Sequence, residues 1–506
     1  MFWRGPVAAL VMASVVLGSA AAVERIVTGG IIRGETLPDG HTIFRGIPYA
    51  KPPVGGLRWM PPEEVEPWYG VRDATKPGPP CLQRSYGWNA ADAHAGKEDC
   101  LYLTVHSPAH APTARLPVMF FIHGGANRAG SGNGFAESLI TRHGVVLVTM
   151  QYRLGVFGFI SSRELTARSP ERASGNYGLL DQIAALKWVR ANIANFGGDP
   201  NNVTIFGHSS GAQDVGLLML SPLARGLFHK AIMESGTPGF GVPPRSLAEN
   251  EELGGDLAKL MGAPDGVVGL KALRAASGND LLDATDKLLP PGNVDPSFIW
   301  LQAVVDGWVV PEPPAEILTA GRQAPVPLII GNSIREFTVE GARNSAYQWI
   351  KDSFGNNSHR ALALYGYEGT KPPVDDPSLG GIVDQVSADV IFRCPARWIA
   401  DRQRALTAKV WRYQLDVAKP GQPQPAIHGS ELPFVFDEHA PNASDAEWPP
   451  LQAYWLNFAK TGDPNGPGLP AWPEMGEGKS YIEFTAQGSR LGEDLRGAIC
   501  ELLANP

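Results

Sequence analysis

The chain has 506 residues, of which 43% are hydrophobic and 19% are charged, proportions typical of a globular enzyme and not of a disordered or fibrous protein. Its formal net charge is −8 and its sequence pI is about 5.8, and the sequence contains no basic stripe, so nucleic acid is not an expected partner. The acidity is too mild and too dispersed to define the charge of a substrate.

The N-terminal segment has the three parts of a secretory signal peptide. Arg4 precedes an apolar run at 7–17, and small residues follow as far as Ala22. A basic start, a short apolar core and an Ala-x-Ala site are typical of a cleavable export signal, and the run is short for a membrane span. The sequence therefore predicts a signal peptide at 1–22 and an exported chain, secreted or periplasmic, with no stable membrane anchor.

Export makes the cysteines informative, because disulfides form in oxidising compartments. The chain has four of them, Cys81, Cys100, Cys394 and Cys500. Four cysteines allow three pairings. None lies in a Cys-x-x-Cys motif or a Cys/His cluster, so we expect neither a metal site nor a thiol redox role.

Apolar runs typical of buried strands alternate with helical patterns along the chain. The runs lie at 117–122, 144–150, 203–206 and 327–330. Between the second and third run, apolar residues recur at helical spacing over 179–195. Fully apolar strands that alternate with helices predict an α/β fold in which helices cover both faces of a mostly parallel sheet.

The remaining sequence suggests one domain with insertions. Short proline- and glycine-rich stretches are typical of loops within a compact body, and no internal repeat or long low-complexity tract divides the chain. Residues 240–320 and 340–390 have more helical and irregular patterns. We therefore expect a single domain over 23–506 with helical cap insertions at these two places.

A glycine-containing loop follows the first apolar run. It reads His123-Gly124-Gly125-Ala126. Acyl transfer passes through a tetrahedral oxyanion, and backbone N–H donors must already be directed at it. We expect the N–H groups of Gly125 and Ala126 to form an oxyanion hole with that of Ser210.

A Gly-x-Ser-x-Gly motif follows the third apolar run and precedes a helical stretch at 212–220. It reads Gly207-His208-Ser209-Ser210-Gly211. A serine at the tip of a sharp strand-to-helix turn is exposed above the sheet, at a helix N-terminus that favours negative charge. The motif therefore predicts Ser209 as a nucleophile. Ser210 is a second serine in the motif, but the spacing places Ser209 at the apex.

These motifs and others in the same order resemble the type-B carboxylesterase family, the relatives of the cholinesterases, over nearly the whole chain after residue 22. Further matching segments lie at 44–50, 98–103, 152–155, 176–182, 196–200, 454–458 and 462–465. The resemblance implies an α/β-hydrolase fold and a serine esterase that hydrolyses small-molecule carboxylic esters through an acyl-enzyme, without a cofactor. It says nothing of the oligomeric state.

The resemblance also implies the other two members of the catalytic triad. It places the acid at Glu336, within 331–336, and the base at His428, within 428–434. Glu340 is a nearby alternative for the acid and His439 for the base, whereas His208 is too close in sequence to Ser209 to act as its base. We expect Ser235 to be a hydrogen-bond partner near the triad.

Pairings in the rest of the chain are implied in the same way. The resemblance suggests the disulfides Cys81–Cys100 and Cys394–Cys500. It also suggests structural ion pairs between Arg58 and Glu98 and between Arg153 and Asp181.

The chain departs from the family pattern at several places in the expected pocket. His208 stands where the family usually has glutamate, Ser210 where it has alanine, and Asn127 where an aromatic residue is usual. Ala126 replaces a common third glycine of the oxyanion loop, and Phe337 follows the acid where glycine is frequent. Because the oxyanion donors are backbone atoms, no catalytic group is lost.

We expect His208, Asn127 and Phe337 to line the pocket and to change the choice of substrate. Without a glutamate before the nucleophile, a preference for neutral esters is predicted. Two other functions fit the sequence less well: a lipase acting at a lipid surface, and a scaffold protein of the same fold that has lost catalysis.

Overall fold

The computed structural model describes residues 22–108, 113–239, 244–288, 303–336, 346–406, 409–437 and 448–504. The predicted signal peptide, apart from Ala22, lies outside the described residues, as do Phe337, Glu340 and His439.

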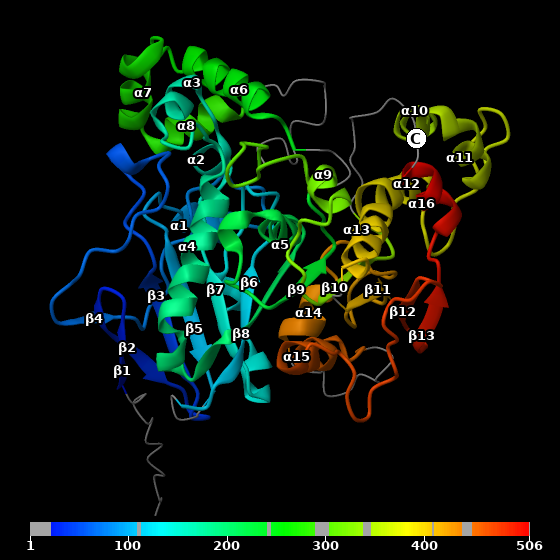
Figure 1. Cartoon of the computed structure of the whole chain (residues 1–506), viewed down its shortest axis with the longest axis horizontal. Helices are drawn as coiled ribbons and strands as arrows, with labels where there is room; N and C mark the ends of the chain where they lie inside the picture. Colours follow the sequence, from blue (N-terminus) through cyan, green and yellow to red (C-terminus); the bar gives the residue numbers. More distant parts are fainter. Residues whose placement is uncertain are drawn as a thin grey trace, which may run out of the picture.

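One sheet of 13 strands runs through the molecule (Figure 1). The strands are β1 (Ala22–Val27), β2 (Gly30–Thr36), β3 (Thr42–Pro48), β4 (Val71–Asp73), β5 (Tyr102–Ser107), β6 (Leu116–Ile122), β7 (Val146–Met150), β8 (Gly198–His208), β9 (Lys230–Glu234), β10 (Leu328–Ser333), β11 (Val410–Asp416), β12 (Ser480–Thr485) and β13 (Gly488–Glu493). Their order is β1-β2-β3-β5-β7-β6-β8-β9-β10-β11-β12-β13, and β4 pairs with β2.

The centre of the sheet is parallel and its two ends are antiparallel. Neighbouring strands are parallel from β7 through β6, β8, β9, β10 and β11 to β12. The pairs of β1 with β2, β3 with β5, and β12 with β13 are antiparallel. The four apolar runs of the sequence correspond to β6, β7, β8 and β10, so the predicted α/β fold with a mostly parallel sheet is confirmed.

The helices lie between the strands in the chain. They are α1 (Ala90–Ala95), α2 (Gly155–Phe159), α3 (Arg163–Arg168), α4 (Tyr177–Asn192), α5 (Ser210–Leu220), α6 (Leu247–Leu260), α7 (Gly266–Ala275), α8 (Gly278–Thr285), α9 (Pro314–Thr319), α10 (Ala346–Phe354), α11 (Ser358–Leu364), α12 (Ile382–Ser387), α13 (Cys394–Arg404), α14 (Glu431–Phe436), α15 (Leu451–Thr461) and α16 (Gly497–Ala504). None of these described helices is both long and apolar enough to cross a membrane.

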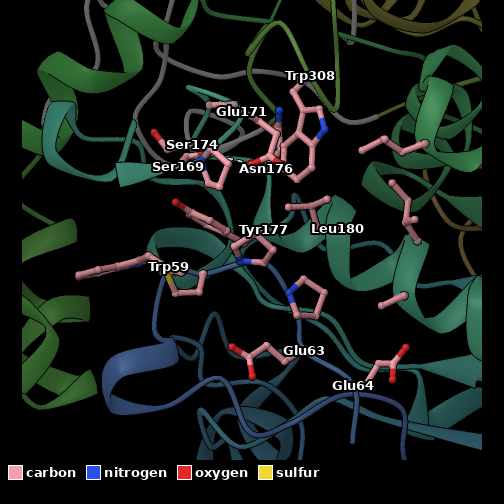
Figure 2. Close-up of a pocket in the computed structure, with 18 of the residues that line it drawn as sticks. Trp59, Glu63, Glu64, Ser169, Glu171, Ser174, Asn176, Tyr177, Leu180 and Trp308 are labelled. Atoms are coloured by element: carbon pink, nitrogen blue, oxygen red, sulfur yellow. Dashed lines mark hydrogen bonds between the residues drawn. The ribbon is translucent and has the colours of Figure 1, made fainter. Parts of the chain in front are cut away.

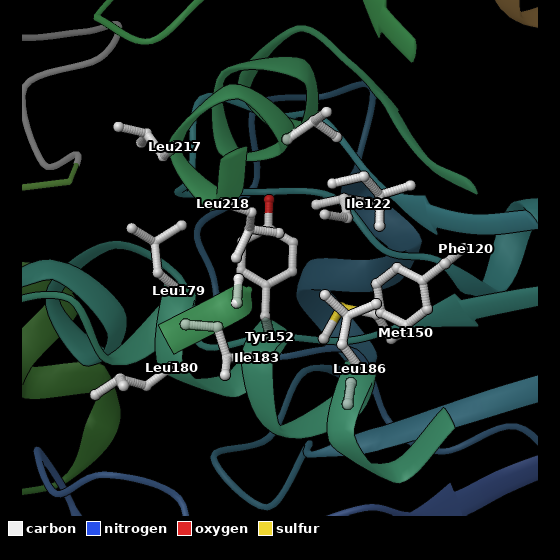
Figure 3. Close-up of a cluster of buried hydrophobic side chains, with 14 of the residues drawn as sticks. Phe120, Ile122, Met150, Tyr152, Leu179, Leu180, Ile183, Leu186, Leu217 and Leu218 are labelled. Carbon is white, nitrogen blue, oxygen red and sulfur yellow. The ribbon is translucent and has the colours of Figure 1, made fainter. Parts of the chain in front are cut away.

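Side chains of the central strands alternate between two cores, because successive residues of a strand point to opposite faces. On one face, Phe120 and Ile122 of β6 pack with residues of α4 and α5. Figure 3 shows these side chains around the ring of Tyr152. On the other face, Met119 and Phe121 pack with residues of α14 and α15. The sheet is therefore a middle layer with helices on both sides.

Two groups of helices interrupt this layered body. Helices α6 to α9 lie between β9 and β10, and α10 to α13 lie between β10 and β11. In Figure 1 the group of α6, α7 and α8 and the group of α10, α11 and α12 lie at opposite sides of the molecule. These are the regions for which the sequence predicts cap insertions, and the division of the chain into domain and caps stays a prediction.

Covalent and ionic links join separate segments of the chain within this body. Cys81 is bonded to Cys100, and Cys394 at the start of α13 is bonded to Cys500 in α16, so both expected disulfides are present. The expected ion pairs are present too. Arg58 Nη2 lies 2.5 Å from Glu98 Oε1, and Arg153 Nη2 lies 2.7 Å from Asp181 Oδ1.

Candidate active site

Five neighbouring parallel strands place the candidate residues at one edge of the sheet. Strands β6, β8, β9, β10 and β11 are adjacent in that order, so their carboxyl ends lie side by side. Each strand is followed in the chain by one of the residues Gly125, Ser209, Ser235, Glu336 and His428. The edge beyond the carboxyl ends of such strands is where α/β proteins bind ligands.

Ser209 stands on a sharp turn between β8 and α5. Its φ of 58° and ψ of −127° are unusual for a residue with a side chain, and this strain is typical of a nucleophile elbow. Ser209 N donates to Glu234 O at 2.9 Å, which fixes the turn against β9. A Cβ on Gly211 would lie 2.0 Å from Ile122 O, and one on Gly236 would lie 2.1 Å from Ser209 O. Both positions therefore require glycine.

The predicted oxyanion loop, which follows β6, is held in a strained conformation. Gly125 has a φ of 120°, Ala126 of 58° and Asn127 of 54°, so three consecutive residues have positive φ. The backbone N–H groups of Gly125 and Ala126 form no hydrogen bond with any described residue. Free N–H donors on a strained, buried loop beside the elbow are the arrangement that stabilises a developing oxyanion.

A buried polar network supports this loop. Asn127 N donates to Ser210 Oγ at 3.0 Å, and Asn127 Nδ2 donates to Asp214 Oδ1 at 3.0 Å. Gln182 Nε2 of α4 donates to Asp214 Oδ2 at 2.6 Å. The Tyr152 hydroxyl lies 3.1 Å from Asn127 Oδ1. The Asn127 side chain is fully buried and directed at Asp214 and Tyr152, so it supports the loop instead of facing an open pocket.

The predicted base and acid are in direct contact. His428 Nδ1 lies 2.5 Å from Glu336 Oε2, and Glu336 Oε1 accepts a hydrogen bond from Ser333 N at 2.9 Å. The Glu336 side chain is buried, whereas 17% of the His428 side chain is exposed. A carboxylate bound to Nδ1 fixes the tautomer that leaves Nε2 as the proton acceptor.

Two further glutamates lie beside this pair. Ser235 Oγ donates to Glu431 Oε1 at 2.5 Å and accepts from Ser333 N at 3.3 Å. Trp455 Nε1 donates to Glu234 Oε1 at 2.6 Å. Ser235 thus lies near the triad as expected, with Glu431 as its partner.

His208 contacts both the base and one of these glutamates. Its ring centroid is 4.5 Å from that of His428, and its Nε2 lies 3.8 Å from Glu431 Oε2. Because His208 directly precedes Ser209, its ring contact places His428 next to the elbow.

Burial dominates the electrostatics of the site, because it disfavours the charged form of each group. It raises the pKa of Glu336, and the hydrogen bond from Ser333 N opposes that rise. Burial lowers the pKa of His428 to about 3. Both shifts favour a neutral imidazole at rest, which is the form a general base needs.

The described residues also form a pocket of about 690 Å³ away from the triad. Figure 2 shows Tyr177 and Leu180 of α4 in it, with Trp59 and Trp308 around them. None of the predicted triad and oxyanion residues lines this pocket. Gln182, which supports Asp214, lies on another side of α4, so the helix separates the pocket from the oxyanion network.

The structure thus brings Ser209, Glu336 and His428 to one edge of the sheet with the oxyanion loop. Sequence reasoning missed Asp214 and Glu431. Glu431 follows the predicted base in the segment His428-Gly429-Ser430-Glu431, and this spacing is the one signal that could have indicated it. The described residues contain no group of three or more His, Cys, Asp or Glu side chains that could hold a metal ion.

Comparison with known proteins identifies the family. Residues 21–503 match the model of the Carboxylesterase family. The chain belongs to the carboxylesterase family. It is similar to the acylcarnitine hydrolase of Mus musculus, with 37% identity over 91% of this chain and 86% of the relative. It is also similar to carboxylesterase 4A of Bos taurus, with 36% identity over 92% of each chain.

Solved structures of carboxylesterases have the same fold. A thermophilic pNB esterase matches with a TM-score of 0.81 and 32% identity over 95% of this chain and 100% of its own. A carboxylesterase of Geobacillus stearothermophilus matches with a TM-score of 0.76 and 33% identity over 95% of this chain and 99% of its own. The predicted α/β-hydrolase fold is confirmed, and the chain is a carboxylic ester hydrolase of the serine hydrolase class that acts on small-molecule esters.

Proposed function

We propose that this carboxylesterase is exported and hydrolyses neutral carboxylic esters through an acyl-enzyme on Ser209. The observation that supports it best is the 2.5 Å contact of His428 Nδ1 with Glu336 Oε2, at the sheet edge where Ser209 stands on its strained turn. The two disulfides agree with an oxidising compartment.

In this mechanism His428 Nε2 removes the proton of Ser209 as Oγ attacks the ester carbonyl. Glu336 holds the imidazole and stabilises the imidazolium, while N–H groups of Gly125, Ala126 and Ser210 bind the oxyanion. The imidazolium then protonates the leaving alcohol. Water attacks the acyl-enzyme in the same way and restores Ser209.

Neutral substrates are proposed because of the residue before the nucleophile. His208 is buried and its ring packs against that of His428, and burial lowers its pKa well below the ordinary value, so it carries no charge. Glu431 is fully buried behind it. A cationic substrate therefore meets no exposed carboxylate at these two residues.

The test of the nucleophile combines turnover with covalent labelling. A fluorescent organophosphonate should label wild type once, and Ser209→Ala should abolish both labelling and ester turnover. A loss of the order of 10⁶ in kcat is expected for a triad serine. Ser210→Ala serves as the matched variant, because labelling that survives in Ser209→Ala and disappears in Ser210→Ala would overturn the assignment.

A further inference from the structure

A second imidazole–carboxylate pair lies beside the predicted triad. His208 Nε2 and Glu431 Oε2 are 3.8 Å apart, and the side chains are 7% and 0% exposed. Neither atom forms a hydrogen bond with any other described residue. Buried polar atoms are costly unless they interact, so a small shift that brings the two into hydrogen-bond distance is favoured.

This pair is joined to the predicted base by two routes. The His208 ring contacts the His428 ring at 4.5 Å. On the carboxylate side, Ser235 Oγ donates to Glu431 and accepts from Ser333 N, which also donates to Glu336. A change at His208 or Glu431 is therefore transmitted to both members of the acid–base pair.

We propose that His208 is a positioning residue for the base: its Nε2–H keeps Glu431 ionised, and its ring holds the imidazole of His428. This inference rests on the proposed function, because it takes His428 as the base. Ionised Glu431 supplies a second negative charge near the imidazolium that forms when His428 takes the Ser209 proton. His208 and Glu431 keep their own protonation states throughout.

The groups around the pair explain why Glu431 needs a donor. Burial raises the pKa of Glu431 to about 7, and the nearby charge of Glu336 adds to the rise. Burial also raises the pKa of Glu234, and Glu431 adds to that rise. Ser235 and Tyr413 donate to Glu431 Oε1, at 2.5 Å and 3.4 Å, so Oε2 is the oxygen that lacks a donor among the described residues.

His208 is suited to be that donor. Burial and the neighbouring His428 lower the pKa of His208, so its imidazole is neutral and retains one N–H. The contact to Glu431 is made through Nε2, which defines the tautomer that the inference requires.

The experiment measures the pH profile of kcat/KM in substituted enzymes. His208→Phe keeps an aromatic ring and loses the N–H, so the acid limb should move to lower pH by roughly half a unit to one unit as the charge on Glu431 is lost. The kcat should fall with little change in KM, because the imidazolium forms only during the reaction. His208→Gln retains an N–H donor and should restore the limb.

Glu431→Gln supplies the independent arm. It should move the acid limb in the same direction as His208→Phe, and the double variant should show no further shift, because both changes remove one interaction. If His208→Phe does not fold, Glu431→Gln alone decides the question. An unchanged limb in Glu431→Gln, or shifts that add in the double variant, would overturn the proposal.

His106→Phe is the matched control, since His106 is also buried and contacts a second histidine, His41, with ring centroids 5.7 Å apart. Its pH profile should equal that of wild type. Organophosphonate titration of Ser209 separates this inference from the proposed function. Full labelling with an unmoved limb counts against His208 alone, whereas an unlabelled and inactive wild type counts against the triad.

Discussion

Two buried polar networks flank Ser209, and they differ in chemistry. The network on the base side consists of titratable groups, with His208 in contact with His428 and Glu431, and Glu336 bound to His428. Its members come from the ends of separate strands, far apart in the chain: Ser235 and the glutamate it binds are separated by 196 positions.

The network on the oxyanion side consists mostly of neutral groups. Asn127, Ser210 and Gln182 contribute amides and a hydroxyl, and Asp214 is its one carboxyl. The proposed oxyanion donors are backbone atoms, and this network holds the loop that carries them.

The difference agrees with the role proposed for each side in ester hydrolysis. The base gains and loses a proton in each half-reaction, so its surroundings must respond to charge. The oxyanion donors must already be in position, so their surroundings must be rigid. Changes on the base side should therefore alter rate and pH dependence together, whereas changes on the oxyanion side should alter rate alone.

The largest effect is expected for the acid of the base side. Glu336→Gln should lower kcat by about 10⁴, because the imidazole loses the group that fixes its tautomer and stabilises its charged form. Steady-state kinetics with an uncharged aryl ester and a circular dichroism spectrum check the effect and the fold. Glu340→Gln is the control, and a crippled Glu340→Gln beside a nearly normal Glu336→Gln would show that the wrong carboxylate was chosen.

The next effect concerns substrate charge, which only the base side should influence. A carboxylate about 5 Å from a cation contributes roughly 3 kcal/mol at an effective dielectric of about 20, or about a hundredfold in affinity. Wild type lacks that carboxylate, and His208→Glu introduces it. The ratio of kcat/KM for acetylthiocholine to that for its uncharged tert-butyl isostere should rise in this variant by up to about a hundredfold.

Wild type itself should prefer the uncharged isostere at fixed ionic strength. A tenfold preference for the cation would contradict the proposed neutral substrate class.

The sequence predicted what depends on local patterns. The apolar central strands, the elbow around Ser209 and the loop at Gly125 each lie within a short segment whose spacing determines its conformation. The networks behind them could not be predicted in this way. Asn127 and Asp214 are 87 positions apart, and their contact depends on how β6 and α5 meet in three dimensions.

Contacts between distant segments also explain the roles of two residues at which the chain differs from its family. Ser210 and Asn127 stand at unusual positions, and the sequence predicted Asn127 to line the pocket. In the structure they bond to each other, since Ser210 Oγ accepts from Asn127 N. The Ser210 hydroxyl accepts the backbone N–H of residue 127, and the Asn127 side chain donates to Asp214, so both departures support the same loop.

On the oxyanion side, Ser210→Ala should lower kcat about tenfold without moving the acid limb. The change leaves the buried Asn127 N–H without its acceptor, which typically costs about 1–3 kcal/mol and lets the loop shift. Ser221→Ala is the matched control, because Ser221 ends the same helix, is buried, and its hydroxyl has no hydrogen-bond partner among the described residues. An acid limb that moves in Ser210→Ala would break the contrast between the two networks.

The smallest effect is on stability and concerns Asp214. Burial raises the pKa of Asp214 from its ordinary value of 3.8 to about 7, and the hydrogen bonds from Asn127 and Gln182 only partly oppose the rise. Between pH 4 and 7, roughly, the folded protein therefore keeps a proton that the unfolded chain has released. Unfolding then releases a proton, so the free energy of unfolding falls as pH rises through this window, by at most about 1.4 kcal/mol per pH unit.

Asp214→Asn removes the group that binds this proton. The part of the pH dependence of the free energy of unfolding that comes from Asp214 should then disappear. The free energy of unfolding of the variant relative to wild type should rise from pH 5 to pH 7 and level off above, as measured by urea unfolding followed by tryptophan fluorescence. Glu234, Glu336 and Glu431 also have pKa values raised by burial, but they are present in both proteins and cancel in the difference. If the free energies of unfolding of variant and wild type changed with pH in parallel, Asp214 would be ionised in the folded protein. The network on the oxyanion side would then carry a fixed negative charge, as the network on the base side does.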